Sequence, residues 1–225
     1  MITATVKGPD WFFGVDACLE ALAALAALLV FWQAYRIYKA TKEKKYGYFA
    51  ASFALLTLSF LSRSAADALI EGLFNVNVEQ HAATIFIVGY LSHIILALIA
   101  YLILVAITYK ITDKKIIALL LLTLLPSMLS KSYYLSFYGL SVIYLAFISM
   151  AYWKNWSAVR TKSACLVFWA FLLMTIAQIQ FLLAVNTSVY VSAHITQAAG
   201  YVLLLFALIF TLFKKNEKVK TRHRV

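Results

Sequence analysis

The sequence predicts an all-α integral membrane protein with seven transmembrane helices. Hydrophobic residues make up 64% of the 225 residues, and the mean hydropathy is +0.86. Apolar runs recur along the whole length, and most are long enough for the roughly 20 residues that a bilayer-spanning helix needs. Most Lys and Arg side chains lie between these runs. We therefore expect one polytopic membrane domain over residues 1–225, without a second, soluble domain.

The apolar runs define where each helix is expected. The predicted helices cover residues 11–36, 47–70, 83–109, 115–131, 133–153, 163–185 and 188–213. All have a length close to that which a bilayer demands, except the fourth. That segment is shorter and carries Pro126 near its end, so a re-entrant segment is its alternative interpretation. Glycine and proline are scarce, which predicts unbroken helices. Residues 214–225 form a basic tail.

The basic residues predict the orientation. The first, third and fifth loops and the tail hold many Lys and Arg residues, whereas the alternate segments hold only Lys7 and Lys131. Lys and Arg are enriched in cytoplasmic loops. All basic segments lie on one side only if the fourth helix crosses the membrane. We therefore predict an outside N-terminus and a cytoplasmic C-terminus, in the cell (plasma) membrane.

The same charge distribution bears on partners. The net charge is +11, which in a soluble protein would favour nucleic-acid binding. Here topology accounts for it, so we expect a lipid bilayer as the partner and no nucleic acid. Cys18 and Cys165 are predicted near opposite membrane faces, so no disulfide is expected between them.

The two outer groups of three helices share short motifs. Their middle helices contain Phe53-Ala-Leu-Leu and Phe171-Leu-Leu-Met, and their third helices contain Tyr90-Leu-Ser-His and Tyr190-Val-Ser-Ala-His. Parallel repeats joined by an inverting helix are a known transporter plan, with the site at the repeat interface. This 3+1+3 layout resembles that of the SWEET-type sugar transporters, although their Pro-Gln signature is absent. The alternative is chance similarity among helices drawn from few residue types.

Polar residues within the predicted helices mark the candidate site, because ionisable groups inside a membrane are costly and usually face a cavity or a partner. Counted from the outer helix ends, they lie roughly 3 to 15 Å below the outer surface. This shared level predicts a hydrated pocket open to the outside. The candidate ligand- or ion-binding residues are Glu20, Arg63, Asp67, His93 and His194, followed by Asp16, Gln178 and Gln180.

The charge of this pocket favours a cationic guest. Arg63 is expected to pair with Glu20 or Asp67, because its guanidinium can bind a carboxylate through two hydrogen bonds. Asp16 and the peripheral Glu71 add further negative charge. The negative charge that Arg63 leaves unbalanced favours a proton, a metal ion or an amine as the bound group. The alternative is a buried ion pair that only fixes helix register, with the histidines as interhelical hydrogen-bond partners.

These features are compatible with several classes of function. A transporter would bind a cation or carry a proton at the acidic groups and histidines, and its helix triplets would rock. A sensor or a membrane-anchoring subunit of a larger complex would need a protein partner at the cytoplasmic loops. A b-type haem protein would ligate iron through His93 and His194.

Catalysis is less well supported by the sequence. A divalent metal, if bound, would use His93, His194, Glu20 and Asp67. However, no two histidines stand at ligand spacing on one helix, so a metal-dependent hydrolase is disfavoured and no catalytic residue is predicted. The layout also resembles that of the rhodopsins, but residues 188–213 contain no lysine for a retinal Schiff base.

Overall fold

The computed structural model describes residues 9–12, 14–70, 84–125 and 133–222, and the side chains of this part as far as residue 210, except those of Asp10, Ile70 and Phe86. This described part consists of helices joined by short turns, with no strand. Lys7, Glu71, Pro126 and Lys131 lie outside the described residues. The predicted all-α class is therefore confirmed for the part of the chain that is described.

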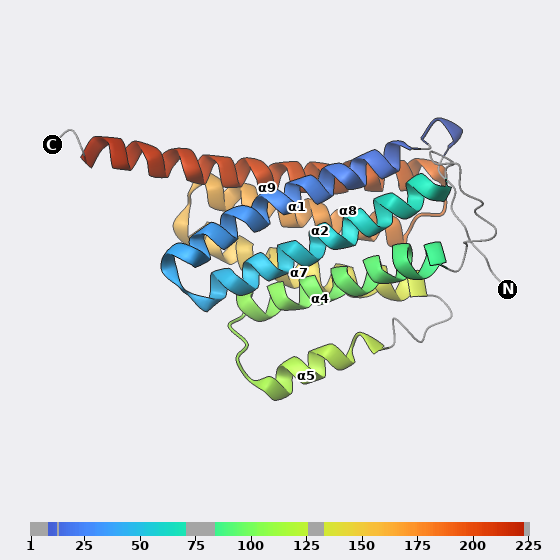
Figure 1. Cartoon of the computed structure of the whole chain (residues 1–225), viewed down its shortest axis with the longest axis horizontal. Coiled ribbons are helices and arrows are strands. Elements are labelled where there is room, and N and C mark those ends of the chain that lie inside the picture. Colours follow the sequence, from blue (N-terminus) through green and yellow to red (C-terminus); the bar gives the residue numbers. More distant parts are fainter. Residues whose placement is uncertain (1–8, 13, 71–83, 126–132, 223–225) are drawn as a thin grey trace.

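Six helices are long and apolar enough to cross a membrane (Figure 1). The elements are η1 (Asp10–Phe12), α1 (Val15–Thr41), α2 (Lys44–Ile70), the π-helix η2 (Ile85–Leu91), α4 (Ser92–Thr108), α5 (Lys114–Leu122), α7 (Tyr133–Val159), α8 (Lys162–Leu182) and α9 (Thr187–Arg222). η2 continues into α4, and together they supply one of the six spans. The multi-pass helical architecture agrees with the sequence prediction.

The observed helices extend beyond the predicted apolar runs at their basic ends. The first, fifth and last helices continue to Thr41, Val159 and Arg222, several residues past the predicted limits. Lys and Arg favour helix, and their long stems cover apolar surface while the charges stay in water, so loss of hydrophobicity does not end a helix. Helices α1 and α7 instead end at Lys42 and Arg160, which adopt the left-handed conformation with φ of 58° and 53°.

The six long helices pack as a closed ring in chain order. Each contacts the next, and α9 closes the ring on α1. We call α1, α2 and η2–α4 the first triplet and α7, α8 and α9 the second triplet. The small side chains of α1, such as Ala23 and Ala27, are almost fully buried, as are larger ones such as Phe171 and Ile148 from the second triplet. Small residues let membrane helices approach closely.

Between the last helix of the first triplet and the first helix of the second, the chain runs back from one end of the bundle to the other. In Figure 1, α1, η2–α4, α7 and α9 all begin at one end of the bundle, which we call the proximal end. Helix α4 ends at the opposite, distal end, whereas α7 begins at the proximal end. Helix α5 lies within this return, outside the ring, and packs mainly on α4. Its nine residues span only about 14 Å, so a seventh membrane crossing stays a prediction.

Candidate functional site

A buried arginine lies inside the ring, toward the proximal end. Arg63 is 4% exposed, and its Nε lies 2.7 Å from Oε1 of Glu20 on α1. The same nitrogen lies 3.7 Å from Oδ2 of Asp67, one turn further along α2. Both carboxylates are buried, Glu20 almost completely. The guanidinium therefore contacts both of the partners that the sequence offered for it.

Asp67 also accepts a hydrogen bond from the π-helix. The hydroxyl of Tyr90 donates to Oδ1 of Asp67 at 2.5 Å. The residue before Tyr90 is Gly89, which packs so closely on α2 that an added Cβ would lie 2.3 Å from the Cβ of Ala66. A π-helix shifts the register of the side chains that follow it, and such irregularities are frequent at functional sites. The helix continues without a break into α4, but its π-helical first part was not predicted from the sequence, where Tyr90 stood out only as part of a repeated motif.

Aromatic side chains of the second triplet face Arg63. Nη1 of Arg63 lies 3.5 Å from the hydroxyl of Tyr138 on α7, which accepts a long hydrogen bond. The Arg63 Cζ lies 5.9 Å from the centre of the Phe181 ring on α8, a cation–π distance. Tyr138 and Phe181 stack on each other, with ring centres 5.1 Å apart. Neither residue was predicted from the sequence, because aromatic residues are ordinary in apolar helices and nothing distinguished these two.

His93 forms a reciprocal contact with α2 one turn below Arg63. Its Nδ1 lies 2.8 Å from Oγ of Ser59, and this hydroxyl lies 3.0 Å from the His93 carbonyl oxygen. The imidazole ring packs between Phe60 and Phe137. This arrangement joins α2 to α4 and is the interhelical role that the sequence offered as the alternative to ligand binding.

His194 belongs to a different group of side chains. Its ring packs against Phe12, Phe181 and Tyr190, with ring centres 4.7 to 5.7 Å apart. Its Nε2 is buried and has no hydrogen-bond partner among the described residues. Through Phe181, this group adjoins the guanidinium of Arg63.

The remaining predicted site residues are distributed around the cluster. Gln178 is buried and donates to Gln197 at 3.3 Å, and the half-buried Gln180 donates to Ser192 at 2.9 Å. Both bonds join α8 to α9, so they stabilise the second triplet. Asp16 is buried one turn before Glu20, and its Oδ1 accepts the N–H of Ala17.

The buried charges of the described residues do not balance. Arg63 is the one buried Lys or Arg side chain there, and it faces the three buried acids Asp16, Glu20 and Asp67. Arg63 and Glu20 meet at ion-pair distance but without hydrogen-bond geometry, and neither oxygen of Glu20 has a hydrogen-bond donor within the described chain. Oδ2 of Asp67 also has no hydrogen-bond donor within the described chain. Buried oxygens without donors are costly, so these oxygens are an unusual feature of the described chain.

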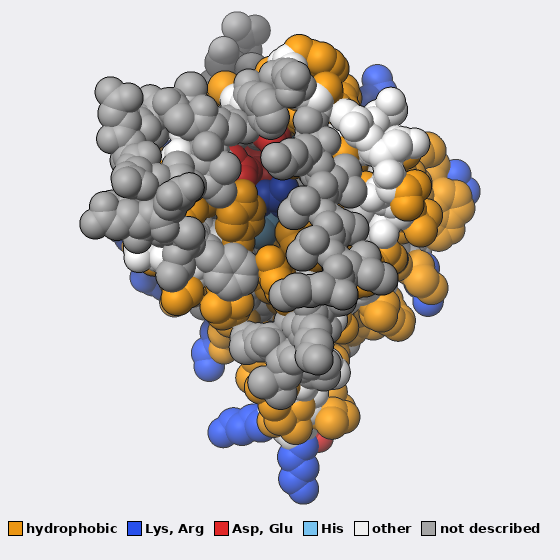
Figure 2. All heavy atoms as spheres, turned by 90° about the vertical axis from the view of Figure 1, so that its right-hand side faces the viewer, with side chains coloured by type: hydrophobic (Ala, Val, Ile, Leu, Met, Phe, Trp, Pro, Cys, Tyr) orange, Lys and Arg blue, Asp and Glu red, His pale blue; other side chains and the backbone are white. Residues whose placement is uncertain are grey.

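Seen from the proximal end, acidic, basic and histidine side chains lie next to one another, with hydrophobic side chains beside them (Figure 2). The buried acids, arginine and histidines of the described chain are Asp16, Glu20, Asp67, Arg63, His93 and His194.

Two of the cofactors considered from the sequence fit this geometry poorly. Within the described residues no three His, Cys, Asp or Glu side chains are placed to hold a metal ion. His93 and His194 each pack against aromatic rings. A porphyrin ligated by both histidines would have to displace those rings, so the two side chains are poorly placed to ligate haem together.

The chain matches no protein-family model, no curated protein and no solved structure. The geometry of its own side chains therefore defines the site: an arginine between two buried carboxylates, with aromatic rings on its other side.

Proposed function

We propose that the protein is a membrane carrier that binds a proton or a small cation at Glu20 and Asp67. One observation carries this proposal: a single buried guanidinium contacts two buried carboxylates. Arg63 can balance only one of these negative charges. An uncompensated carboxylate is costly in a membrane interior, so it favours a proton or a cation beside it.

We also propose an internal repeat, which would suit a carrier. The same number of positions separates Phe53 from Phe171 and Thr57 from Thr175, and in each helix the threonine hydroxyl donates to the phenylalanine carbonyl oxygen at 2.8 Å. The same spacing relates the left-handed turn residues Lys42 and Arg160. Helices α1 and α7 correspond as well, since each has 27 residues.

The repeat also suggests why the cluster lies where it does. At the same spacing Arg63 corresponds to Phe181, whose ring its guanidinium contacts. Two corresponding residues meet only near the axis that relates two repeats. The proposed ion site would therefore lie at the repeat interface, which is where carriers built from repeats bind their substrates.

We further propose that the chain crosses the plasma membrane seven times, with the proximal end outside and the C-terminus in the cytoplasm. The α1–α2 and α7–α8 turns both lie at the distal end, and both are basic. Cytoplasmic loops have this character. The return of the chain between Thr108 and Tyr133 supports a seventh crossing in the region of α5.

The test is ion flux into vesicles that contain the purified protein. The probes are protons, followed with an internal pH dye, then Na⁺, K⁺ and tetramethylammonium. We expect flux of at least one probe, and we expect Glu20→Gln and Asp67→Asn each to reduce it about tenfold or more. Glu43→Gln is the matched control, because Glu43 is half exposed at the distal end and should not affect flux.

Two results would overturn the carrier: no flux of any probe, or full flux in a folded Glu20→Gln, Asp67→Asn double variant. The sensor remains the second candidate, because a packed layer that includes Phe53, Leu56 and Leu98 fills the ring below the site. A sensor would bind a cation without moving it. Cation-dependent protection against unfolding, with no flux, would favour this second candidate.

A further inference from the structure

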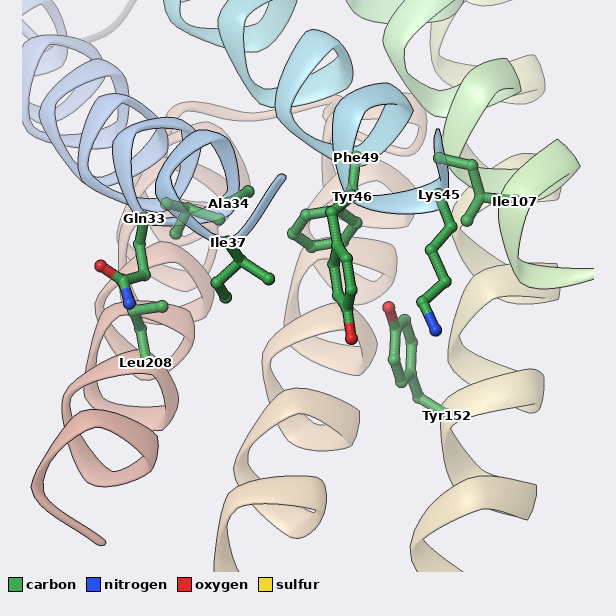
Figure 3. Close-up of a pocket in the computed structure, with 10 residues that line it drawn as sticks. Gln33, Ala34, Ile37, Lys45, Tyr46, Phe49, Ile107, Tyr152 and Leu208 are labelled. Atoms are coloured by element: carbon green, nitrogen blue, oxygen red, sulfur yellow. The ribbon is translucent and has the colours of Figure 1, made fainter. Parts of the chain in front are cut away.

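A separate cavity lies inside the ring at the distal end. Its volume is about 300 Å³, at the lower limit of pockets that bind small organic molecules. Helices α1, α2, α4, α7 and α9 all contribute to its wall (Figure 3). The lining residues are Val30, Gln33, Ala34, Ile37, Lys45, Tyr46, Phe49, Ile107, Tyr152 and Leu208.

The lining of this distal cavity divides into an apolar wall and a small group of donors. Val30, Ala34 and Phe49 belong to the apolar wall, which makes up most of the surface. In Figure 3 the ammonium of Lys45 and the hydroxyls of Tyr46 and Tyr152 point toward one another. An ammonium only donates hydrogen bonds, and a tyrosine hydroxyl readily donates. A guest with acceptor atoms could therefore take hydrogen bonds from all three groups.

Charge indicates which acceptor fits. The ammonium of Lys45 lies 4.8 Å from the centre of the Tyr46 ring and 2.6 Å from Oε2 of Glu43. The side chain of Lys45 is 58% exposed and that of Glu43 is 50% exposed, and such exposed pairs are weak. An anion that also accepts hydrogen bonds from Tyr46 and Tyr152 can therefore compete with Glu43 for this ammonium.

We propose that the distal cavity binds one amphipathic anion, a carboxylate or phosphate head on an apolar tail. The head would sit at Lys45, Tyr46 and Tyr152, and the tail would extend along Val30 and Ala34. A membrane fatty acid and a water-soluble acid share this chemistry. The site does not depend on the proposed carrier, because Glu20 and Val30 lie about 15 Å apart along α1.

Direct titration of the purified protein in nonionic detergent tests this site. The probes are dodecanoate, as a membrane acid, hexanoate, as a soluble acid, and uncharged dodecanol. We expect one molecule of acid per chain and much weaker binding of dodecanol. Lys45→Gln should weaken acid binding about tenfold. Lys44→Gln is the matched control, because Lys44 is the neighbouring lysine in the sequence and does not line the cavity.

A cavity-filling variant separates this site from nonspecific detergent-like binding. Ala34→Phe should abolish binding, because Ala34 is 4% exposed and its side chain borders the space for the tail. Tyr152→Phe provides a milder variant if Ala34→Phe does not fold, with an expected loss of severalfold. A preference for either acid supports the site. A preference for dodecanoate indicates a ligand from the membrane, and a preference for hexanoate indicates a water-soluble ligand. Unchanged binding in folded Ala34→Phe or Tyr152→Phe, or equal binding of dodecanol, would overturn the proposal.

Discussion

The two helix triplets contribute different chemistry to the same buried site. The first triplet supplies the charges, with Arg63 between Glu20 and Asp67. The second triplet supplies aromatic surface, with Tyr138 and Phe181 on the opposite side of the guanidinium. An aromatic face attracts a cation but carries no formal charge. The second triplet can therefore hold Arg63 in place without neutralising it, and the charge balance is set within the first triplet.

This division predicts that changes in the first triplet have the larger effects. Removing a buried charge leaves its partner uncompensated, whereas removing a hydroxyl or a ring face costs only that contact. Variants in the two triplets can be compared through the free energy of unfolding of the purified protein in detergent.

The largest effect is expected for Arg63→Met. Methionine fills much of the same space but leaves Glu20 and Asp67 buried without a cation. We expect a loss of about 3–5 kcal/mol in the free energy of unfolding, as for other broken buried ion pairs. Adding Glu20→Gln and Asp67→Asn to Arg63→Met should restore most of the loss. A stable Arg63→Met protein would show that the carboxylates are not held by this arginine.

The fold class could be predicted because the membrane imposes a simple rule: only long apolar runs can form spanning helices. Helix ends were less predictable, since basic residues such as Lys39 and Lys154 continue the helix rather than ending it. The fourth predicted helix was the weakest: its last part lies outside the described residues, and Lys114–Leu122 forms a short helix outside the ring.

The charged half of the site could be predicted because charged residues are costly, and therefore rare, inside a membrane. Buried carboxylates and arginine stand out in apolar runs. Tyr138 and Phe181 do not stand out, because their role depends on which helices become neighbours across the ring. Tyr90 depends on a π-helix whose register follows from side-chain packing, which composition does not encode.

The next largest effect is expected for Gly89→Ala in the first triplet. A Cβ at this position would meet the Cβ of Ala66 at 2.3 Å, so η2 or α2 must move. We expect a loss of about 2–3 kcal/mol, typical of overpacking. Gly139→Ala in α7 is the control, because no atom lies within 4 Å of its added Cβ and alanine favours helix. Equal effects of the two variants would argue against close packing of η2 on α2.

A matched pair of tyrosines tests the hydrogen bond that the π-helix supplies. Tyr90→Phe removes the donor to Asp67 and should cost about 1.5–2 kcal/mol, because the acceptor is a buried carboxylate. Tyr190→Phe in the second triplet keeps the ring contacts with Phe181 and His194 and should change stability by less than about 0.5 kcal/mol. The reverse order would mean that the tyrosine of the second triplet, and not that of the first, carries the polar contact.

The smallest effect is expected for Tyr138→Phe. The bond from Arg63 to this hydroxyl is long, at 3.5 Å, whereas the ring stacks closely on Phe181. Phenylalanine keeps the stacking, so the loss should be about 0.5 kcal/mol, at the lower limit for a hydrogen bond. Tyr138→Leu, which removes the ring as well, should cost clearly more. If Tyr138→Phe were as costly as Tyr138→Leu, the second triplet would stabilise Arg63 through its hydroxyl, and the contrast between charged and aromatic triplets would be wrong.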